Sequence, residues 1–282
     1  MAQSDVFWLG PAGGLRALPS PSLDGPPEMV PVRTGGTHRS LTGRPTLDRL
    51  GIRRTWTLTW PYLDPDTRSW LSALYAGLVP GPLWLLDPSD RNRLPVQVAT
   101  AGAVEHTADG FTASTGTLAW QAAPVVPTGT STPLGASALV WTATAASGGT
   151  MVTLDPVPVM PDEVVTFAAS LAATVAVRLT AFVLDASGAT LTTAQSPAAT
   201  PGASGARMSL AIPATAGAAL IRPGLALAQA GAITTSAWSL TTGDTAPTWS
   251  TGGGASTVLL DQLPWKYPIP GAFSTTLVLL EV

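Results

Sequence analysis

Residues that could carry out chemistry are few in this sequence. Cysteine is absent, which excludes a thiol nucleophile, a disulfide framework and a thiolate metal site. His38 lies in a stretch rich in arginine, glycine and threonine with no second metal-ligand type nearby, and His106 follows Glu105 in a similarly isolated position. Both histidines are therefore expected in solvated loops. The Gly-rich stretch at residues 251–256 lacks the Lys-Ser/Thr of a phosphate-binding loop.

Paired carboxylates are the remaining route to catalysis. Glycoside hydrolysis needs two of them about 5–10 Å apart across a cleft. The close acidic pairs are Asp64 with Asp66 and Asp162 with Glu163. Asp64 suits a helix N-cap with Pro65 in the first turn, and the second pair is expected in a surface turn. We therefore expect no enzyme and no cofactor, although a distant carboxylate pair keeps a wall-degrading glycosidase open as the least favoured alternative.

The composition favours a turn-rich β-protein. Of 282 residues, 45% are hydrophobic and only 11% are charged, well below the usual quarter, while 28 glycines and 27 prolines mark many short turns. Lys266 is the only lysine, and no block of the chain is basic enough to bind nucleic acid electrostatically. No apolar run reaches the ~18 residues of a membrane span, and the first residues do not resemble a signal peptide.

The N-terminal third predicts a strand, a short helix and further strands. Trp56, Leu58 and Trp60 alternate with threonines, which is typical of a strand wetted on one side. A helix is expected from Asp64 to Gly77, followed by strands at residues 82–88 and 92–100.

Residues 20–51 predict a long loop with brief strands. Such a loop is usually functional or ordered by a partner. Its arginines, Arg39, Arg44 and Arg49, suit contacts with the acids of another subunit, although a solvated loop is an equal alternative.

From about residue 105 the sequence predicts roughly nine short strands, which indicates a sandwich or jelly roll. Residues 185–188 (DASG) suit a hairpin turn. Trp141 and Trp238 occupy strand positions where a buried ring is normal. Trp120 and Trp249 lie nearer loops, so they are the residues that we assign to stacking on a sugar.

The segments at residues 161–169, 178–188 and 240–249 resemble three places in the jelly-roll carbohydrate-binding modules of glycosidases and phage tail proteins. The turn departs from the pattern, with Pro-Asp where glycine is usual, and Thr241 and Thr242 replace acids of the closing phrase. The resemblance implies a glycan ligand. It also implies a structural calcium ion, for which Asp109, Asp155 and Asp244 are candidates by residue type alone.

The outer parts of the chain resemble another family. The WTLTW strand at residues 56–60, the YPIPG turn at 267–271 and the final TLVLLEV at 276–282 are similar to minor tail proteins of long-tailed phages (siphoviruses) of actinobacteria. They are most similar to the distal tail proteins, whose N-terminal domain shares the tail-tube β-barrel. Trp265 and Tyr267, which precede the last strand, are assigned to a subunit interface.

Together the two resemblances imply an all-β protein with an inserted domain. Residues 1–104 and 258–282 would form a split, ring-forming tail-tube-like barrel or sandwich with one short helix. Residues 105–252 would form an inserted jelly roll, and residues 253–257 a Gly-rich linker.

The predicted function is that of a virion structural protein at the tail tip, made in the host cytoplasm. It would form a ring, hexameric in the family, that connects the tail tube to other tail-tip proteins and leaves a channel for DNA. The alternative is a receptor-binding module for host cell-wall glycan, anchored by its barrel. No membrane insertion is expected.

Overall fold

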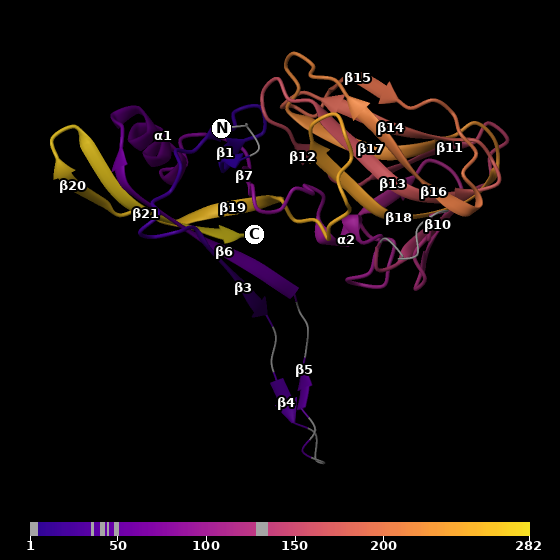
Figure 1. The fold of residues 1–282 in the computed structure, drawn as a ribbon, viewed down its shortest axis with the longest axis horizontal. Coiled ribbons are helices and arrows are strands. Elements are labelled where there is room, and N and C mark those ends of the chain that lie inside the picture. The colour runs from indigo at the N-terminus through magenta and orange to yellow at the C-terminus, as the bar shows by residue number, and fades with distance from the viewer. Residues whose placement is uncertain (1–4, 35–36, 40–42, 44, 48–50, 128–134) are drawn as a thin grey trace. The chain divides into compact units, whose positions relative to one another are not determined.

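The computed structural model describes residues 5–34, 37–39, 43, 45–47, 51–127 and 135–282 (Figure 1). In this part of the chain the structure is almost entirely β, with antiparallel sheets and two short helices. The chain divides into two compact units. The smaller holds residues 6–11, 16–85 and 256–282, and the larger holds residues 86–255 together with residues 1–5 and 12–15.

The smaller unit contains one eight-stranded sheet built from both ends of the chain. The order along the sheet is β2-β1-β7-β19-β21-β6-β3, with β20 paired to β21. The strands are β1 (Trp8–Pro11), β2 (Arg16–Ala17), β3 (Glu28–Thr34), β6 (Gly51–Leu63), β7 (Leu83–Leu86), β19 (Ala255–Gln262), β20 (Trp265–Ile269) and β21 (Ala272–Glu281). The prediction that the last strands pair with the N-terminal ones is confirmed, since β21 pairs with β6 over most of its length. Among the described residues the path stays open between β2 and β3, where the sequence predicted a barrel or sandwich.

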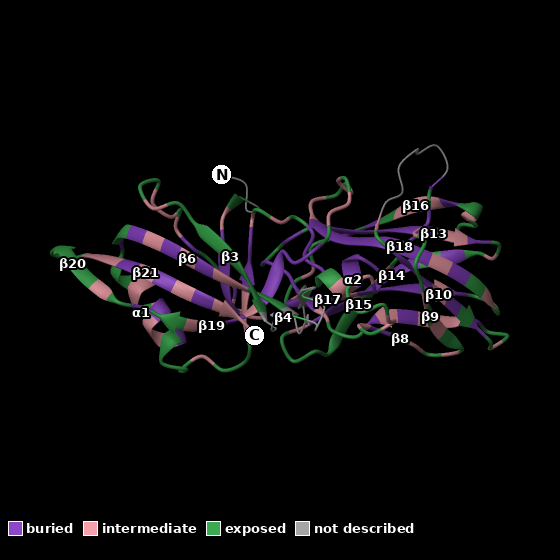
Figure 2. Ribbon diagram, turned by 90° about the horizontal axis from the view of Figure 1, so that it is seen from below, coloured by how far each residue is buried: buried purple, intermediate pink, exposed green. Residues whose placement is uncertain are grey.

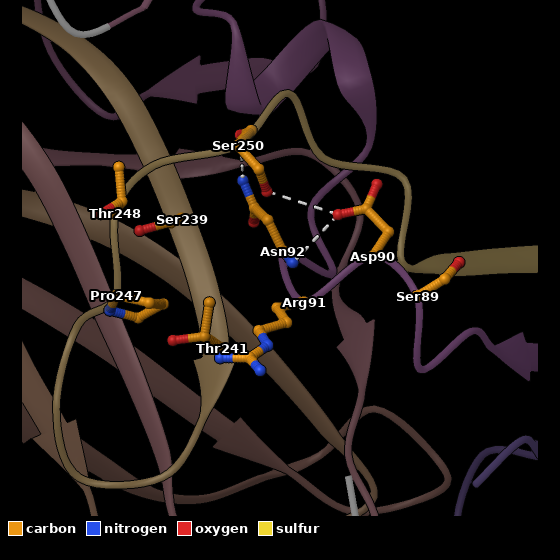
Figure 3. Close-up of a pocket in the computed structure, with 9 residues that line it drawn as sticks. All are labelled: Ser89, Asp90, Arg91, Asn92, Ser239, Thr241, Pro247, Thr248 and Ser250. Atoms are coloured by element: carbon orange, nitrogen blue, oxygen red, sulfur yellow. Dashed lines mark hydrogen bonds between the residues drawn. The ribbon is translucent and has the colours of Figure 1, made fainter. Parts of the chain in front are cut away.

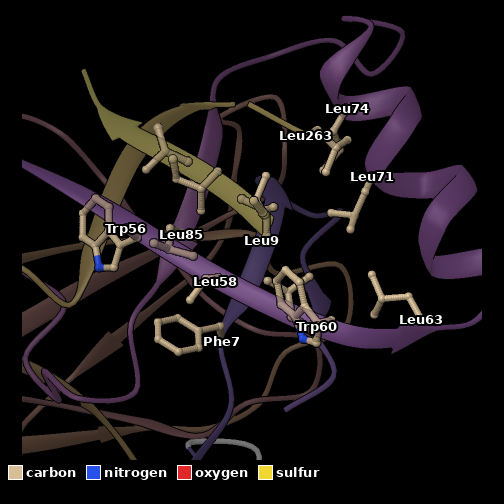
Figure 4. Packing of buried hydrophobic residues seen from close by; sticks show 14 residues of the cluster. Phe7, Leu9, Trp56, Leu58, Trp60, Leu63, Leu71, Leu74, Leu85 and Leu263 are labelled. Carbon is tan, nitrogen blue, oxygen red and sulfur yellow. The ribbon is translucent and has the colours of Figure 1, made fainter. Parts of the chain in front are cut away.

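Alternating side chains of β6 and β21 build the core of this unit (Figures 2 and 4). Trp56, Leu58 and Trp60 are buried, and the threonines between them are half-buried, as the alternation predicted. Leu277 and Leu279 of β21 lie in the same cluster. The two neighbouring strands therefore bury apolar side chains in one common core.

Helix α1 (Pro65–Tyr75) begins and ends where the sequence predicted. Asp64 is its N-cap, with a side chain that accepts a hydrogen bond of 2.8 Å from the Thr67 amide. Gly77 follows the C-cap residue with φ +68°, a left-handed conformation that glycine adopts at little cost. The helix buries Leu71 and Leu74 in the core cluster.

Strands β3 and β6 pair as the two arms of a hairpin, from Glu28↔Thr57 to Thr34↔Gly51. A separate two-stranded ladder, β4 (Thr37–Arg39) with β5 (Pro45–Leu47), lies in the connection. The brief strands predicted within this segment are confirmed at residues 29–33, which lie in β3.

The larger unit is a sandwich of two antiparallel sheets. One has the order β16-β13-β18-β10-β9 and the other β15-β14-β17-β11-β8, with β12 paired to β17. The strands of the first are β9 (Thr117–Gln121), β10 (Ala138–Ala143), β13 (Val165–Ala173), β16 (Gly202–Ile212) and β18 (Gly231–Thr242). Those of the second are β8 (Phe111–Ala113), β11 (Gly149–Thr153), β12 (Val157–Pro158), β14 (Val177–Leu184), β15 (Thr190–Gln195) and β17 (Leu220–Leu227). The rings of Phe111 and Trp238, one from each sheet, meet edge to face with centroids 5.0 Å apart.

The β14–β15 hairpin turns at the predicted DASG sequence. The Asp185 carboxylate accepts hydrogen bonds from the amides of Ser187 and Ala189, and Gly188 has φ +85°. The Ser187 hydroxyl also donates to this carboxylate. The hydroxyl bond, followed by the amide bonds, lowers the pKa of Asp185.

The predicted boundary at residue 104 and the predicted linker at 253–257 differ from the observed structure. The larger unit begins at Leu86, because Asn92, Arg93 and Leu94 are buried in it. Gly253 and Gly254 are buried too, and their amides donate to the carbonyls of Leu94 and Asn92. Residues 253–254 therefore pair with residues 92–94, and the next strand begins at Ala255.

The strand predicted at residues 92–100 is wrong. Residues 92–94 belong to no strand, and the short helix α2 (Val96–Ala99) follows Pro95. The apolar pattern here reflects burial of Leu94, Val98 and Ala99, and burial alone does not distinguish a short helix from a strand.

Candidate functional site

The outer face of the five-stranded sheet carries a polar site. Along β18, Trp238 and Leu240 point into the core between the sheets, so Ser239 and Thr241 point to the opposite face. A hollow of about 240 Å³ lies at this end of the face (Figure 3). It is lined by Ser239 and Thr241 together with residues 89–92, Pro247, Thr248 and Ser250.

Asn92 holds the wall of this first hollow in place. Its side-chain amide donates to the carbonyls of Trp238 and Ser250, and its side-chain oxygen accepts from the amide of Leu240 at 3.0 Å. This buried side chain is thus satisfied by both the strand and the covering loop. Sequence reasoning missed Asn92, because its partners are about 150 residues away.

The charges of the first hollow are arranged asymmetrically. The Asp90 carboxylate accepts hydrogen bonds from the backbone amide of Asn92 at 3.2 Å and from the Ser250 hydroxyl at 3.4 Å. The exposed Arg91 side chain extends away from that carboxylate (Figure 3). The Thr241 hydroxyl oxygen is buried and has no hydrogen-bond partner in the described part of the chain. Such an unsatisfied buried hydroxyl is unusual in a folded protein.

A second hollow, of about 450 Å³, shares Pro247 and Thr248 with the first. It is also lined by Arg207, Met208 and Ser209 of β16 and by Ala246 and Trp249. Trp249 is half-buried, and its indole nitrogen donates to the Ala99 carbonyl at 3.1 Å, which anchors the ring at the hollow.

Arg207 links the two hollows. Its guanidinium donates to the Ala237 carbonyl and the Ser239 hydroxyl, both at 2.8 Å, and to the Ser170 hydroxyl at 3.5 Å. All three acceptors are neutral, and no carboxylate pairs with Arg207 in the part of the chain that the structure describes. Burial lowers the pKa of this guanidinium, which nevertheless stays charged at neutral pH.

The two tryptophans assigned to sugar stacking occupy different places. Trp249 lines the second hollow, whereas Trp120 lines neither of the two. Trp120 lies opposite Leu139 on the core-facing side of edge strand β9, with its ring centroid 4.7 Å from that of His106. Of the two tryptophans, only Trp249 therefore lines one of these two hollows, and sugar stacking stays a prediction for both. Trp141 and Trp238 are fully buried, which confirms their predicted place in the core.

The described residues that were assigned to a subunit interface lie in two different elements, β4 and β20. Arg39 is exposed in β4, while Arg44 and Arg49 lie outside the described residues. The rings of Trp265 and Tyr267, together with that of Phe273, surround the Arg68 guanidinium at centroid distances of 4.5–5.8 Å. These aromatic residues attach the β20–β21 hairpin to α1, and the Tyr267 side chain remains 66% exposed.

The acidic pairs have structural surroundings. Hydrogen bonds from the Thr67 hydroxyl and amide lower the pKa of Asp64, the N-cap of α1. Glu163 is buried in an ion pair with Arg93, so its predicted place in a surface turn is wrong, whereas Asp162 is exposed in a turn.

Within the described residues, no three His, Cys, Asp or Glu side chains lie close enough together to hold a metal ion. Asp109, one of the calcium candidates, accepts a hydrogen bond from the Thr107 hydroxyl. The calcium ion stays a prediction. None of the described helices is long and apolar enough to cross a membrane.

No protein-family model and no curated protein matches the chain. Solved structures that match include the enzymatically active domain of bacteriophage CBA120 tailspike protein 4, at 14% identity and TM-score 0.43, over 54% of this chain and 21% of that one. The CBM22-1 xylan-binding domain of Paenibacillus barcinonensis Xyn10C matches at 15% identity and TM-score 0.36, over 50% and 90%. TmCBM61 in complex with β-1,4-galactotriose matches at 14% identity and TM-score 0.37, over 55% of this chain and 100% of that one. At these scores the likenesses assign neither a family nor an activity to this chain.

Proposed function

We propose that this chain is a structural, non-enzymatic protein of a phage tail that assembles through its smaller unit into a ring at the distal end of the tail tube. The ring is hexameric, as in the family that the outer sequence resembles, and it connects the tube to other tail-tip proteins around a channel for DNA. The larger unit is the displayed domain.

The observation that carries this proposal is the apolar edge of the eight-stranded sheet. Strand β3 ends the described pairing path, with β6 on one side. Met29, Val30 and Val32 are 42–48% exposed, and Ile52 of β6 is 61% exposed. Because side chains alternate along a strand, apolar groups lie on both faces of this hairpin. A free edge of this kind promotes association unless something covers it, so we assign a second copy of the chain to it.

Light scattering and negative-stain microscopy of the purified full chain test the proposal. We expect a closed ring with an axial hole. The double substitution Val32→Glu with Ile52→Glu should shift the protein to smaller species, because charges then occupy the apolar edge. Leu191→Glu, at an exposed position on β15 of the larger unit, is the matched control and should assemble normally. A wild-type chain that stays monomeric at high concentration, alone and with tail-tube protein, would overturn the proposal.

A second function, binding of host cell-wall glycan, is favoured by the second hollow. Sugars bind proteins through aromatic faces and neighbouring polar groups, and Trp249 lies there beside the Ser209 and Thr248 hydroxyls. Titration of the full chain with oligosaccharides, followed by tryptophan fluorescence, tests this function. Trp249→Ala should abolish the fluorescence response and the binding. Unchanged binding in this variant would contradict the assignment.

A further inference from the structure

The two hollows differ from a neutral sugar site in their charge. Arg207 is the only charged residue that lines the second hollow, and in the first the Arg91 side chain extends away from Asp90 (Figure 3). Among the described residues neither guanidinium has a carboxylate partner. Asp90 also lines the first hollow, so the formal charges balance there, whereas Arg207 gives the second hollow a positive charge that no ion pair among the described residues neutralises.

Arg207 is also held in a fixed position. Its bonds to Ala237 and Ser239 tie it to β18, and the longer bond to Ser170 ties it to β13. A guanidinium has five N–H donors, and these three bonds use only part of them. Partial removal of the cation from water is unfavourable, and a bound anion would offset that cost. The fork of donors matches a carboxylate or phosphate group in shape.

Thr241 adds an unused hydrogen-bonding group beside Arg91. Its side chain is 3% exposed, and its hydroxyl oxygen has no partner within the described chain. Thr241 lies two residues from Ser239, which Arg207 contacts, so one strand presents both hydroxyls to the first hollow. A ligand oxygen that accepts from Thr241 would satisfy the hydroxyl without any change in the fold.

We infer that the two hollows, which share Pro247 and Thr248, together bind a saccharide that carries a negative charge, as a carboxylate or a phosphate. The anion binds at Arg207 and Arg91, and a sugar ring packs against Trp249. The Thr241 hydroxyl donates a hydrogen bond to the same ligand. This inference rests on the second proposed function, glycan binding, and is independent of ring assembly.

The test uses the full chain with three probes: trigalacturonic acid, poly(glycerol phosphate) and neutral β-1,4-galactotriose. We expect at least one charged probe to bind tenfold or more tightly than the neutral one, with affinity that falls as salt is added. Comparison of the two charged probes distinguishes a carboxylate from a phosphate. Arg207→Met should lower affinity for the charged probe at least tenfold, while Arg207→Lys should retain more of it.

Two further variants separate ligand binding from folding. Thr241→Val removes the unpartnered hydroxyl while keeping the shape, so thermal stability should be unchanged or higher while affinity for the charged probe falls severalfold. Arg178→Met, on an exposed position of β14, is the matched control and should bind as wild type.

The outcomes distinguish the inference of an anionic ligand from the proposed function of glycan binding. If galactotriose binds as tightly as the charged probes or more tightly, the inference of an anionic ligand is overturned but glycan binding is supported. Binding of none of the three probes would overturn both. Preferential binding of a charged probe that Arg207→Met and Thr241→Val leave unchanged would also overturn this site.

Discussion

Arg93 and Glu163 form a buried ion pair through two parallel hydrogen bonds of 2.6 Å each. Their side chains are 6% and 1% exposed. The Thr242 hydroxyl donates to Glu163 and accepts from Arg93, and the Met160 amide donates to Glu163 at 2.9 Å. The pair therefore joins the first residues of the larger unit to the turn before β13 and to the end of β18.

Removal of one partner of this pair should strongly destabilise the larger unit. Glu163→Gln or Arg93→Met leaves the other polar group buried without its counter-charge, which costs about 3–5 kcal/mol of unfolding free energy. The double variant with apolar residues at both positions should lose less than the two single losses added together. Urea unfolding followed by tryptophan fluorescence measures this, with Asp162→Asn at the exposed neighbour as control. Single variants within about 1 kcal/mol of wild type would contradict a structural role for the pair.

The smaller unit should lose stability in acid through Glu281. Burial alone would raise the pKa of this carboxyl, but hydrogen bonds and the charge of Arg54, with a bond from Ser256, lower it below its ordinary 4.5. The folded state then binds fewer protons than the unfolded state. The stabilisation is fully present above the ordinary pKa and is lost as the pH falls through the lower folded value.

Comparison with Glu281→Gln isolates this effect from the lowered pKa values of Asp64 and Asp185, which act in the same direction. The difference in Tm between wild type and the variant should be largest near neutral pH and should shrink as the pH falls from the ordinary pKa of 4.5 through the lower folded pKa. A difference that stays constant over that range would show that the charge of Glu281 is irrelevant to stability.

Helix α1 should depend on its N-cap. Asp64→Ala leaves the Thr67 amide without its acceptor and should cost about 1 kcal/mol, whereas Asp64→Ser restores an acceptor and should cost much less. Thermal unfolding by circular dichroism compares the two. Equal losses in both variants would mean that the cap bond contributes little.

Close packing at the end of the larger unit should exclude a side chain at Gly254. A Cβ atom there would lie 2.1 Å from the Asp90 carbonyl oxygen, so the backbone must move in Gly254→Ala. At Gly243, with φ +99°, an added Cβ meets nothing within 4 Å, so Gly243→Ala adds backbone strain without a clash. We expect Gly254→Ala to lower the Tm more. The reverse order would show that residues 90 and 254 separate readily.

Local patterns predicted the elements that form within a few residues. The alternation around Trp56, the cap at Asp64 and the turn at Asp185 depend on neighbours in sequence, and each is found as expected. The same is true of the buried positions of Trp141 and Trp238, where a strand pattern surrounds the ring.

The sequence could not predict features that depend on distant partners. The local sequence predicts a turn at Glu163 because Arg93, its ion-pair partner, is 70 residues away. It predicts a linker at Gly254 because Asn92, the partner of its amide, precedes nearly the whole larger unit. The hollows were missed for the same reason, since Arg207 of β16 and Trp249 of the loop after β18 line one hollow although they are distant in sequence. An isolated arginine in a strand with no acid nearby is the one local signal that could have indicated an anion site.

The strand order of the eight-stranded sheet determines when that sheet can form. Its central strands, β19 and β21, are synthesised after most of the larger unit, whereas β1, β6 and β7 are synthesised before it. The larger unit is nearly contiguous in sequence, so it is able to fold before β19 and β21 are synthesised and pair with the early strands β6 and β7.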